Sequence, residues 1–202
     1  MLLPPDDNTC HAGVVVLDRA SLPAWQRRLL ASGSVALDVA HTGGVGDWVE
    51  ADLVIDELAL AYWLGVLLER EVARGAGLQD FRALRGALFR CGRNHVAGRS
   101  FRSRDVEVLN RLARGPLVQT AMDISGAAVL PVVSVDQALA HIAREGIALL
   151  TGPLRGRVRE CAADDCQLLF VDASRPGRRQ SCSMARCGNM AKTRAYRGRT
   201  DR

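Results

Sequence analysis

The sequence predicts a mainly α-helical N-terminal domain with a small β-hairpin, followed by a small treble-clef-like zinc finger. Three observations lead to this fold class. Apolar residues recur at helical spacing through much of the chain, two apolar runs flank a Ser-Gly turn near residue 125, and four cysteines form two close pairs near the C-terminus. We therefore divide the 202 residues into a leader (1–32), a helical domain (33–152) and a finger (153–202).

The composition is typical of a folded soluble protein, with 48% apolar and 24% charged residues. The longest uncharged apolar run, Leu58 to Leu68, is too short to cross a bilayer, and the N-terminus lacks the features of a signal peptide. We therefore expect a cytoplasmic protein without a membrane partner. Thiols stay reduced in that compartment, so grouped cysteines indicate a metal site rather than disulfides.

Charge is distributed unevenly along the chain. Residues 1–154 contain 15 Lys and Arg against 17 Asp and Glu, whereas residues 155–202 contain 12 against 5. A basic C-terminal segment on a mildly acidic body favours a phosphate-rich partner such as DNA. The alternative is that the basic segment only aids solubility.

The leader contains a short apolar run, Val14 to Leu17, and a short helix around Trp25 to Leu30. The next apolar run, 34–40, fits a strand or a helix, because so short a run does not reveal its period. A glycine-rich loop over 41–47 ends this run.

Three helices are predicted next. Residues 51–74 form a long central helix that is apolar on most faces and is followed by two glycines. A second helix spans 78–91, and Ser103 is placed to cap a third that ends at Gly115-Pro116. The second helix carries arginines that we interpret as a solvated face, namely Arg82, Arg85 and Arg90.

A hairpin and a fourth helix complete the helical domain. The apolar runs 117–124 and 127–133 flank Ser125-Gly126, which is a turn signal. Ser134 and Gln137 have the spacing of a capping box, which predicts a helix beginning directly after the hairpin.

The cysteines near the C-terminus form two C-x4-C pairs separated by fifteen residues. Zinc prefers a tetrahedron of four such ligands, and two short pairs joined by a loop supply it without a large fold. Because the protein fills all four positions, this zinc would be structural and not catalytic. We interpret Cys10 and Cys91 as small buried hydrophobic residues. The predicted zinc ligands are Cys161, Cys166, Cys182 and Cys187.

The segment between the pairs predicts a short strand whose Leu168 and Phe170 pack over the metal. Ser183 can cap a helix that runs through Arg197 and carries arginines on one face, interrupted by Met190. Such a face could enter a DNA groove or lie along phosphates. The predicted nucleic-acid contacts are Arg178, Arg179, Arg186, Lys192, Arg194 and Arg197.

Three runs, Val158 to Cys166, Leu169 to Asp172 and Cys182 to Lys192, resemble the CGNR zinc-finger family. That finger usually follows a mostly helical domain called ABATE, and Val35 to Thr42 is similar to the opening Leu-Asp-x-x-Asn-Thr pattern of that domain. The resemblance covers about residues 33 to 199. It implies a bacterial, stress-linked transcription regulator with the four cysteines as zinc ligands and the finger as the DNA binder.

Two positions depart from the family pattern. The signature would read Cys-Gly-Asn-Arg, whereas Met190 follows Asn189 here. Ser181 replaces the aromatic residue that usually precedes the third cysteine. Neither change affects a ligand, so the zinc prediction is unaffected, while the DNA surface loses one basic contact.

The leading functional hypothesis is a DNA-binding regulator whose helical domain senses a small-molecule effector or mediates dimerisation. A homodimer is expected because one small finger reads little sequence. The alternative is a protein-interaction module in which zinc only stabilises the C-terminus. We do not expect an enzyme, because the four histidines are scattered and no catalytic triad, phosphate loop or dinucleotide motif is present.

Overall fold

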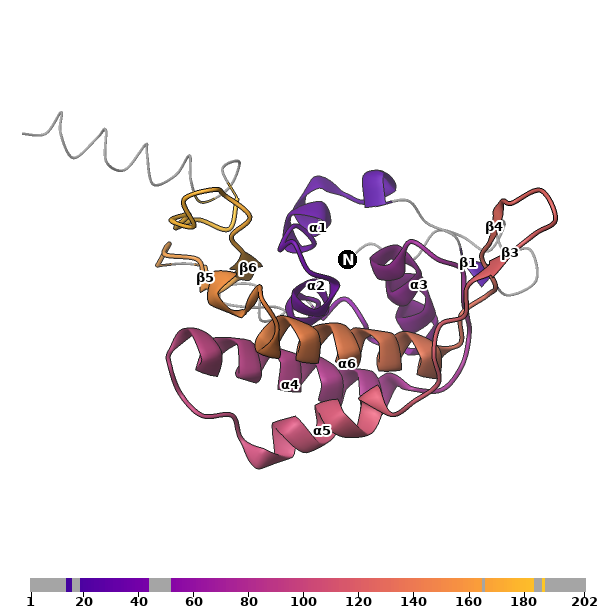
Figure 1. Cartoon of the computed structure of the whole chain (residues 1–202), viewed down its shortest axis with the longest axis horizontal. Helices are drawn as coiled ribbons and strands as arrows, with labels where there is room; N and C mark the ends of the chain where they lie inside the picture. The colour runs from indigo at the N-terminus through magenta and orange to yellow at the C-terminus, as the bar shows by residue number, and fades with distance from the viewer. Residues whose placement is uncertain (1–13, 16–18, 44–51, 165, 184–186, 188–202) are drawn as a thin grey trace, which may run out of the picture.

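The computed structural model describes residues 14–15, 19–43, 52–164, 166–183 and 187, and within these ranges the fold is mainly α-helical, as predicted (Figure 1). The helices are α1 (Ala24–Leu29), α2 (Val35–His41), α3 (Glu57–Leu68), α4 (Leu78–Val96), α5 (Ser103–Ala113) and α6 (Val135–Thr151). None of the helices in this part of the chain is long and apolar enough to span a bilayer.

Short antiparallel strand pairs accompany the helices. They are β1 (Val14–Val15) with β2 (Val72–Ala73), β3 (Ala121–Met122) with β4 (Ala128–Val129), and β5 (Val158–Glu160) with β6 (Leu169–Val171). The β3–β4 pair confirms the hairpin predicted around Ser125-Gly126, whereas β5 was not predicted.

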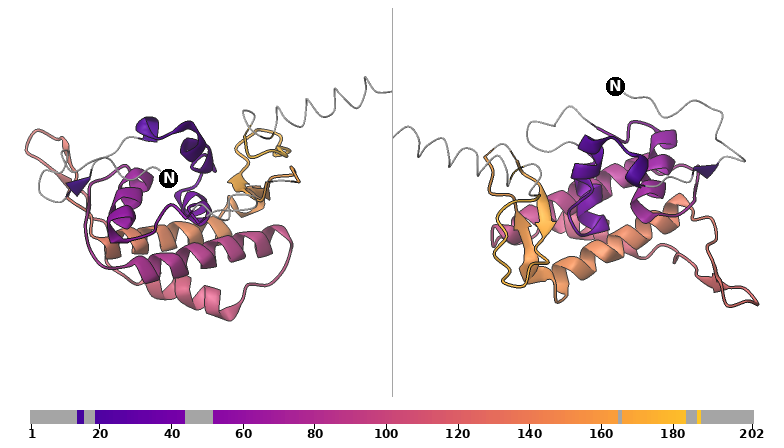
Figure 2. Two further views of the ribbon diagram at one scale, coloured as in Figure 1. Left: turned by 180° about the vertical axis from the view of Figure 1, so that it is seen from behind. Right: turned by 90° about the horizontal axis from the view of Figure 1, so that it is seen from above.

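The long helices α4, α5 and α6 pack side by side, and α2 and α3 lie across them (Figure 1). Their shared core includes the fully buried side chains of Leu60, Phe81, Leu84, Leu139 and Ile142. The β3–β4 and β5–β6 hairpins extend from opposite ends of this body, which the views from behind and above also show (Figure 2). The finger therefore lies next to α1, α2 and the C-terminal end of α6.

Local capping explains where the helices begin. Ser134 Oγ accepts a hydrogen bond from Gln137 N at 3.2 Å, and Gln137 Oε1 accepts one from Ser134 N at 2.9 Å, so the capping box is confirmed. The prediction that Ser103 caps α5 was wrong, because Arg102 occupies the cap position and makes no side-chain cap bond. The ambiguous run 34–40 is helical and forms most of α2.

The prediction of one long helix over 51–74 was wrong, because α3 spans only Glu57–Leu68. Asp56 caps α3 by accepting a hydrogen bond from Ala59 N at 2.7 Å, and Glu69 ends it in a left-handed conformation with φ of +52°. Val72 then pairs with Val15 of β1 and bridges to Val133, so the backbone groups here bond to other strands instead of continuing the helix.

The arginines of α4 are not simply a solvated face. Arg85 forms a two-bond ion pair with Asp52 at 2.6 and 3.0 Å, and this lowers the pKa of the Asp52 carboxyl. Arg90 pairs with Asp105, which is buried, at 2.6 Å. Arg82 is exposed, as expected. All three arginines contact neighbouring segments, Arg85 and Arg90 through ion pairs and Arg82 through a hydrogen bond to Ile55 O at 3.3 Å.

Residues 19–32, which we had assigned to the leader, pack into the helical core. Leu22 and Leu30 are buried in it. Arg19 donates hydrogen bonds to backbone carbonyls at the end of α3 and pairs at 3.3 Å with Asp38 of α2. Asp38 also accepts hydrogen bonds from Ser32, and burial raises the pKa of its carboxyl.

His41 connects three segments of the chain at a fully buried position. Its Nε2 accepts a hydrogen bond from Leu169 N at 3.1 Å, so the ring proton lies on Nδ1, which donates to Leu29 O at 3.2 Å. Burial lowers the pKa of His41 to about 4. The neutral ring thus joins the end of α1, the end of α2 and strand β6.

We predict that His41 makes the folded state sensitive to acid. The unfolded chain binds a proton at His41 near pH 6.5 and the folded chain only near pH 4, so stability falls as the pH decreases between these values. The loss amounts to about 3 kcal/mol at about 1.4 kcal/mol per pKa unit. The His41→Asn variant carries the residue that the family pattern has at this position. It should reduce the dependence of the free energy of unfolding on pH, which urea unfolding from pH 7 to pH 4 measures.

The matched control is His141→Asn, at a half-buried position of α6. This variant removes a histidine from the same domain and leaves the His41 ring in place, so the slope assigned to His41 should remain. An equal slope in His41→Asn and the unchanged protein would contradict the assignment.

Candidate metal centre

The first cysteine pair lies in the loop of the β5–β6 hairpin. Cys161 directly follows β5, and its N–H extends the ladder by donating to Leu168 O at 2.9 Å. Cys166 closes a turn by donating from its N–H to Ala163 O at 2.9 Å. The hairpin therefore places both sulfurs at one end of the two strands.

The second pair reaches the site through a turn organised by Asp172. Its Oδ1 accepts hydrogen bonds from Ser174 N and Oγ at 3.0 and 2.6 Å, and its Oδ2 accepts one from Arg179 N at 2.9 Å. These bonds, that from the Ser174 hydroxyl first, lower the pKa of Asp172. Gly177 supplies the left-handed residue of the turn with φ of +60°. The reversed chain then brings Cys182 opposite the hairpin loop.

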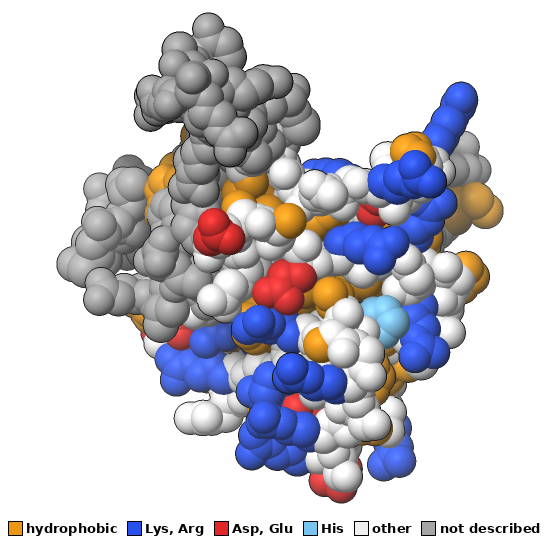
Figure 3. All heavy atoms as spheres, turned by 90° about the vertical axis from the view of Figure 1, so that its left-hand side faces the viewer, with side chains coloured by type: hydrophobic (Ala, Val, Ile, Leu, Met, Phe, Trp, Pro, Cys, Tyr) orange, Lys and Arg blue, Asp and Glu red, His pale blue; other side chains and the backbone are white. Residues whose placement is uncertain are grey.

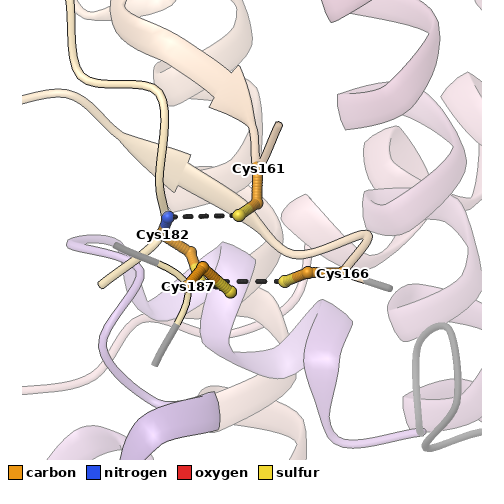
Figure 4. Close-up of side chains that lie close together, drawn as sticks. All are labelled: Cys161, Cys166, Cys182 and Cys187. Carbon is orange, nitrogen blue, oxygen red and sulfur yellow. Dashed lines mark hydrogen bonds between the residues drawn. The ribbon is translucent and has the colours of Figure 1, made fainter. Parts of the chain in front are cut away.

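The four predicted ligands come together in a buried cluster (Figure 4). Their sulfurs all lie within 4.8 Å of one another, with Cys182 Sγ at 3.7 Å from Cys166 Sγ and 3.6 Å from Cys187 Sγ. Sulfurs in a tetrahedron about 2.3 Å from zinc are about 3.8 Å apart, whereas a disulfide requires about 2.05 Å. The donor set and its spacing therefore fit a structural zinc ion.

Without a cation, thiols this close oppose one another's ionisation. The hydrogen bond from Cys182 lowers the pKa of Cys166 to about 5, while bonding to Cys166 and burial raise the pKa of Cys182. Burial raises the pKa of Cys187 to about 12. A divalent ion removes this conflict because it stabilises all four thiolates at once.

Apolar side chains from both halves of the molecule enclose the cysteines. Leu168 and Phe170 pack against them, as predicted. Leu29 of α1 belongs to the same buried cluster, and Trp25 packs against it. The contribution of α1 was not predicted. Trp25 and Leu29 stand four residues apart, so the sequence indicates an apolar face on α1. It does not indicate that this face packs against the cysteine cluster.

Only two of the six predicted nucleic-acid contacts lie in the described part of the chain. Arg178 is exposed. Arg179 instead turns inward, donating to Ser181 O at 2.7 Å and to Cys182 O, with its guanidinium carbon 4.8 Å from the centre of the Phe170 ring. Arg179 thus supports the second cysteine pair. Outside the described residues lie Arg186, Met190, Lys192, Arg194 and Arg197.

Further basic side chains surround the described part of the finger. Arg155, Arg159 and Arg175 are exposed alongside Arg178. Figure 3 looks at the end of the molecule that carries the finger and shows Lys and Arg side chains gathered there, with fewer acidic ones between them. Cys91, by contrast, is buried in α4, and burial raises its pKa to about 11, which agrees with its interpretation as a hydrophobic residue.

The fold and the cysteine site define a two-part zinc-finger protein, with a helical domain followed by a basic four-cysteine finger. Residues 33–153 match the ABATE family model, described as "Putative stress-induced transcription regulator", and residues 157–200 match the CGNR zinc finger. The chain therefore belongs to the ABATE family and carries a CGNR zinc finger. A search of curated proteins found no match.

We predict that the purified protein holds one zinc per chain. Cys161→Ser or Cys187→Ser should release the metal, because three thiolates no longer close the tetrahedron, and should unfold the finger while most of the helical signal remains. Elemental analysis and circular dichroism measure the two effects. Cys91→Ala is the matched control and should keep its zinc. Protein purified without zinc, or full retention in both serine variants, would refute the assignment.

Proposed function

We propose that this chain is a cytoplasmic bacterial transcription regulator that binds duplex DNA through its C-terminal finger. The observation that carries the proposal is the combination of a buried four-cysteine site with the positive charge excess of residues 155–202. The ABATE family description supports a regulator. In this proposal the helical domain senses an effector, mediates dimerisation, or does both.

The chemistry of the cysteine site favours binding over catalysis. Four thiolates saturate zinc, so no coordination position is left for a substrate or an activated water. The metal then holds a small fold rigid, and the exposed arginines around it supply contacts to phosphates. We therefore propose no enzymatic activity for this site.

The second candidate function is a protein-interaction module with a purely structural zinc. In the described part of the finger, the apolar side chains of β5 and β6 pack against α1, α2 and the body, which favours the charged surface as the contact region. Salt dependence separates the two functions, since phosphate contacts release counterions and protein contacts mostly do not.

We predict that DNA affinity of the full-length zinc protein falls steeply with salt. Arg194→Ala and Arg197→Ala should each lower the slope of log K against log salt by about one unit if each meets a phosphate. Arg114→Ala is the matched control, since Arg114 is exposed at the end of α5, and should leave the slope unchanged. Fluorescence anisotropy on duplex DNA measures these slopes, and salt-independent binding would favour the interaction module.

Substitution in the full chain tests this proposal more sharply than deletion does. Removal of residues 155–202 should abolish DNA binding, but it also uncovers apolar residues of the body that the finger covers, such as Leu37 and Leu149. Single arginine changes keep Val158, Leu169 and Val171, which cover these residues, in the chain.

The β3–β4 hairpin supports the proposed dimer. Residues 117–132 contain one charged residue, Asp123, yet Met122 is 74% exposed and Ile124 is fully exposed. Free strand edges of this kind are usually protected by charges, so a missing charge pattern indicates a partner strand. We propose that the hairpin pairs with the same hairpin of a second copy.

We predict that Met122→Asp combined with Ile124→Asp shifts the protein from dimer to monomer, because the paired hairpins would then bury like charges. Sedimentation velocity measures the change. The control is Val96→Asp, which places the same charge at an exposed apolar position on α4 and should leave the dimer intact. A protein that is monomeric before substitution would overturn this part of the proposal.

A further inference from the structure

A pocket of about 310 Å³ lies between α4, the loop that joins α4 to α5, and strand β5 of the finger. One wall is apolar and includes Phe89 and Ala97. The lining contains one acidic residue, Glu160, against four arginines, which are Arg90, Arg93, Arg99 and Arg102. The stretch 81–104 that supplies these arginines contains no Asp or Glu. The pocket is therefore strongly positive.

The four arginines differ in how far they are bound by other residues of the protein. Arg90 is held by the buried Asp105, with three contacts between 2.6 and 3.0 Å. The side chains of Arg99 and Arg102 are exposed and make no ion pair or hydrogen bond with any residue that the structure describes. Two guanidinium groups at the pocket are thus available to an external anion.

The loop that carries the free arginines is held in place. Asn94 Nδ2 donates to Ser100 O at 3.2 Å, and Arg99 N donates to Asn94 O at 2.8 Å. Gly98 provides the left-handed residue with φ of +65° that this tight loop requires. The backbone of this loop is thus already ordered, and binding an anion needs to order only the Arg99 and Arg102 side chains.

Arg93 connects the pocket to the finger. Its guanidinium lies 3.3 Å from a Glu160 carboxylate oxygen and 3.3 Å from Gln167 Oε1, both of them finger residues. These contacts are long, and the Arg93 side chain is 44% exposed, so the ion pair is weak and exchangeable. Glu160 directly precedes the zinc ligand Cys161.

We propose that this pocket binds a small organic anion bearing a phosphate or carboxylate group, which Arg93, Arg99 and Arg102 hold while its carbon skeleton packs on Phe89. Guanidinium groups bind both anions through paired hydrogen bonds. The bound anion competes with Glu160 for Arg93 and so changes a contact between the body and the finger. The effect of the anion on the finger matters for regulation only if the proposed DNA-binding function is right. Binding of the anion in the pocket does not depend on that function.

The test uses the full-length zinc protein without DNA. Inorganic phosphate and succinate are titrated by calorimetry at constant ionic strength, with chloride as the reference salt. Saturable binding is expected for at least one of the two, and the better probe identifies the preferred group. Arg99→Ala combined with Arg102→Ala should weaken it about tenfold or more, since each lost charged hydrogen bond costs that order of affinity.

Two single variants make the outcome specific. Arg104→Ala removes a nearby exposed arginine that does not line the pocket, and it should leave affinity unchanged. Glu160→Gln removes the acidic side chain of the pocket lining and releases Arg93, so it should tighten anion binding.

The proposal is overturned if neither anion binds saturably, or if the double variant binds as tightly as the unchanged protein. It is also overturned if Arg104→Ala loses as much affinity as the double variant. If neither small anion binds while Arg99→Ala with Arg102→Ala weakens duplex DNA binding, the arginines belong to the DNA surface and the proposal is also wrong. If the protein binds the anion but does not bind DNA, the proposal for the pocket stands and only the proposed DNA-binding function is refuted.

Discussion

The buried hydrogen bond from Leu169 N to His41 Nε2 joins the finger to the helical domain, and the rest of the arrangement depends on it. Strand β6 has two buried faces. Phe170 points to the cysteines, whereas Leu169 and Val171 pack on the body beside Leu37 of α2. Loss of the bond would leave an unpaired N–H in an apolar environment, a penalty of about 1–3 kcal/mol. Together with the hydrogen bond from Val171 N to Ser32 O at 2.7 Å, this bond positions β6 on the body, and with it the cysteines.

Close packing at the same place explains why the finger is not an independent appendage. A Cβ atom on Gly92 of α4 would lie 2.5 Å from Leu169 Cδ1, so the strand approaches the helix closely here and a larger residue would displace the Leu169 side chain. Trp25 and Leu29 of α1 cover the cysteine cluster from the other side. Zinc thus stabilises more than the finger, because the chain it organises also buries apolar surface of the body.

The parts of the structure that were predicted from the sequence depend on short spacings. The two C-x4-C pairs, the capping box at Ser134 and the hairpin turn at Ser125-Gly126 are decided within a few residues, so local chemistry suffices. The wrong cap at Ser103 is a local error of one residue, and the other failures involve distant partners. Arg85 pairs with Asp52 across 33 residues, and His41 meets Leu169 across 128, while the end of α3 depends on a sheet that β2 forms with other segments. No local pattern contains these partners.

The β5–β6 hairpin contributes residues to the arginine pocket, to the cysteine site and to the contact with His41. Glu160 of β5 faces the arginine pocket and pairs in the ladder with Leu169, the residue that donates to His41. Cys161 follows Glu160 directly, so the first zinc ligand begins where the pocket ends. In the proposed mechanism, a change in the Arg93–Glu160 contact reaches Cys161 through the chain and Leu169 through the ladder. The proposed anion would therefore bind beside a short ladder that carries the cysteine site at one end, which would connect the pocket physically to the finger.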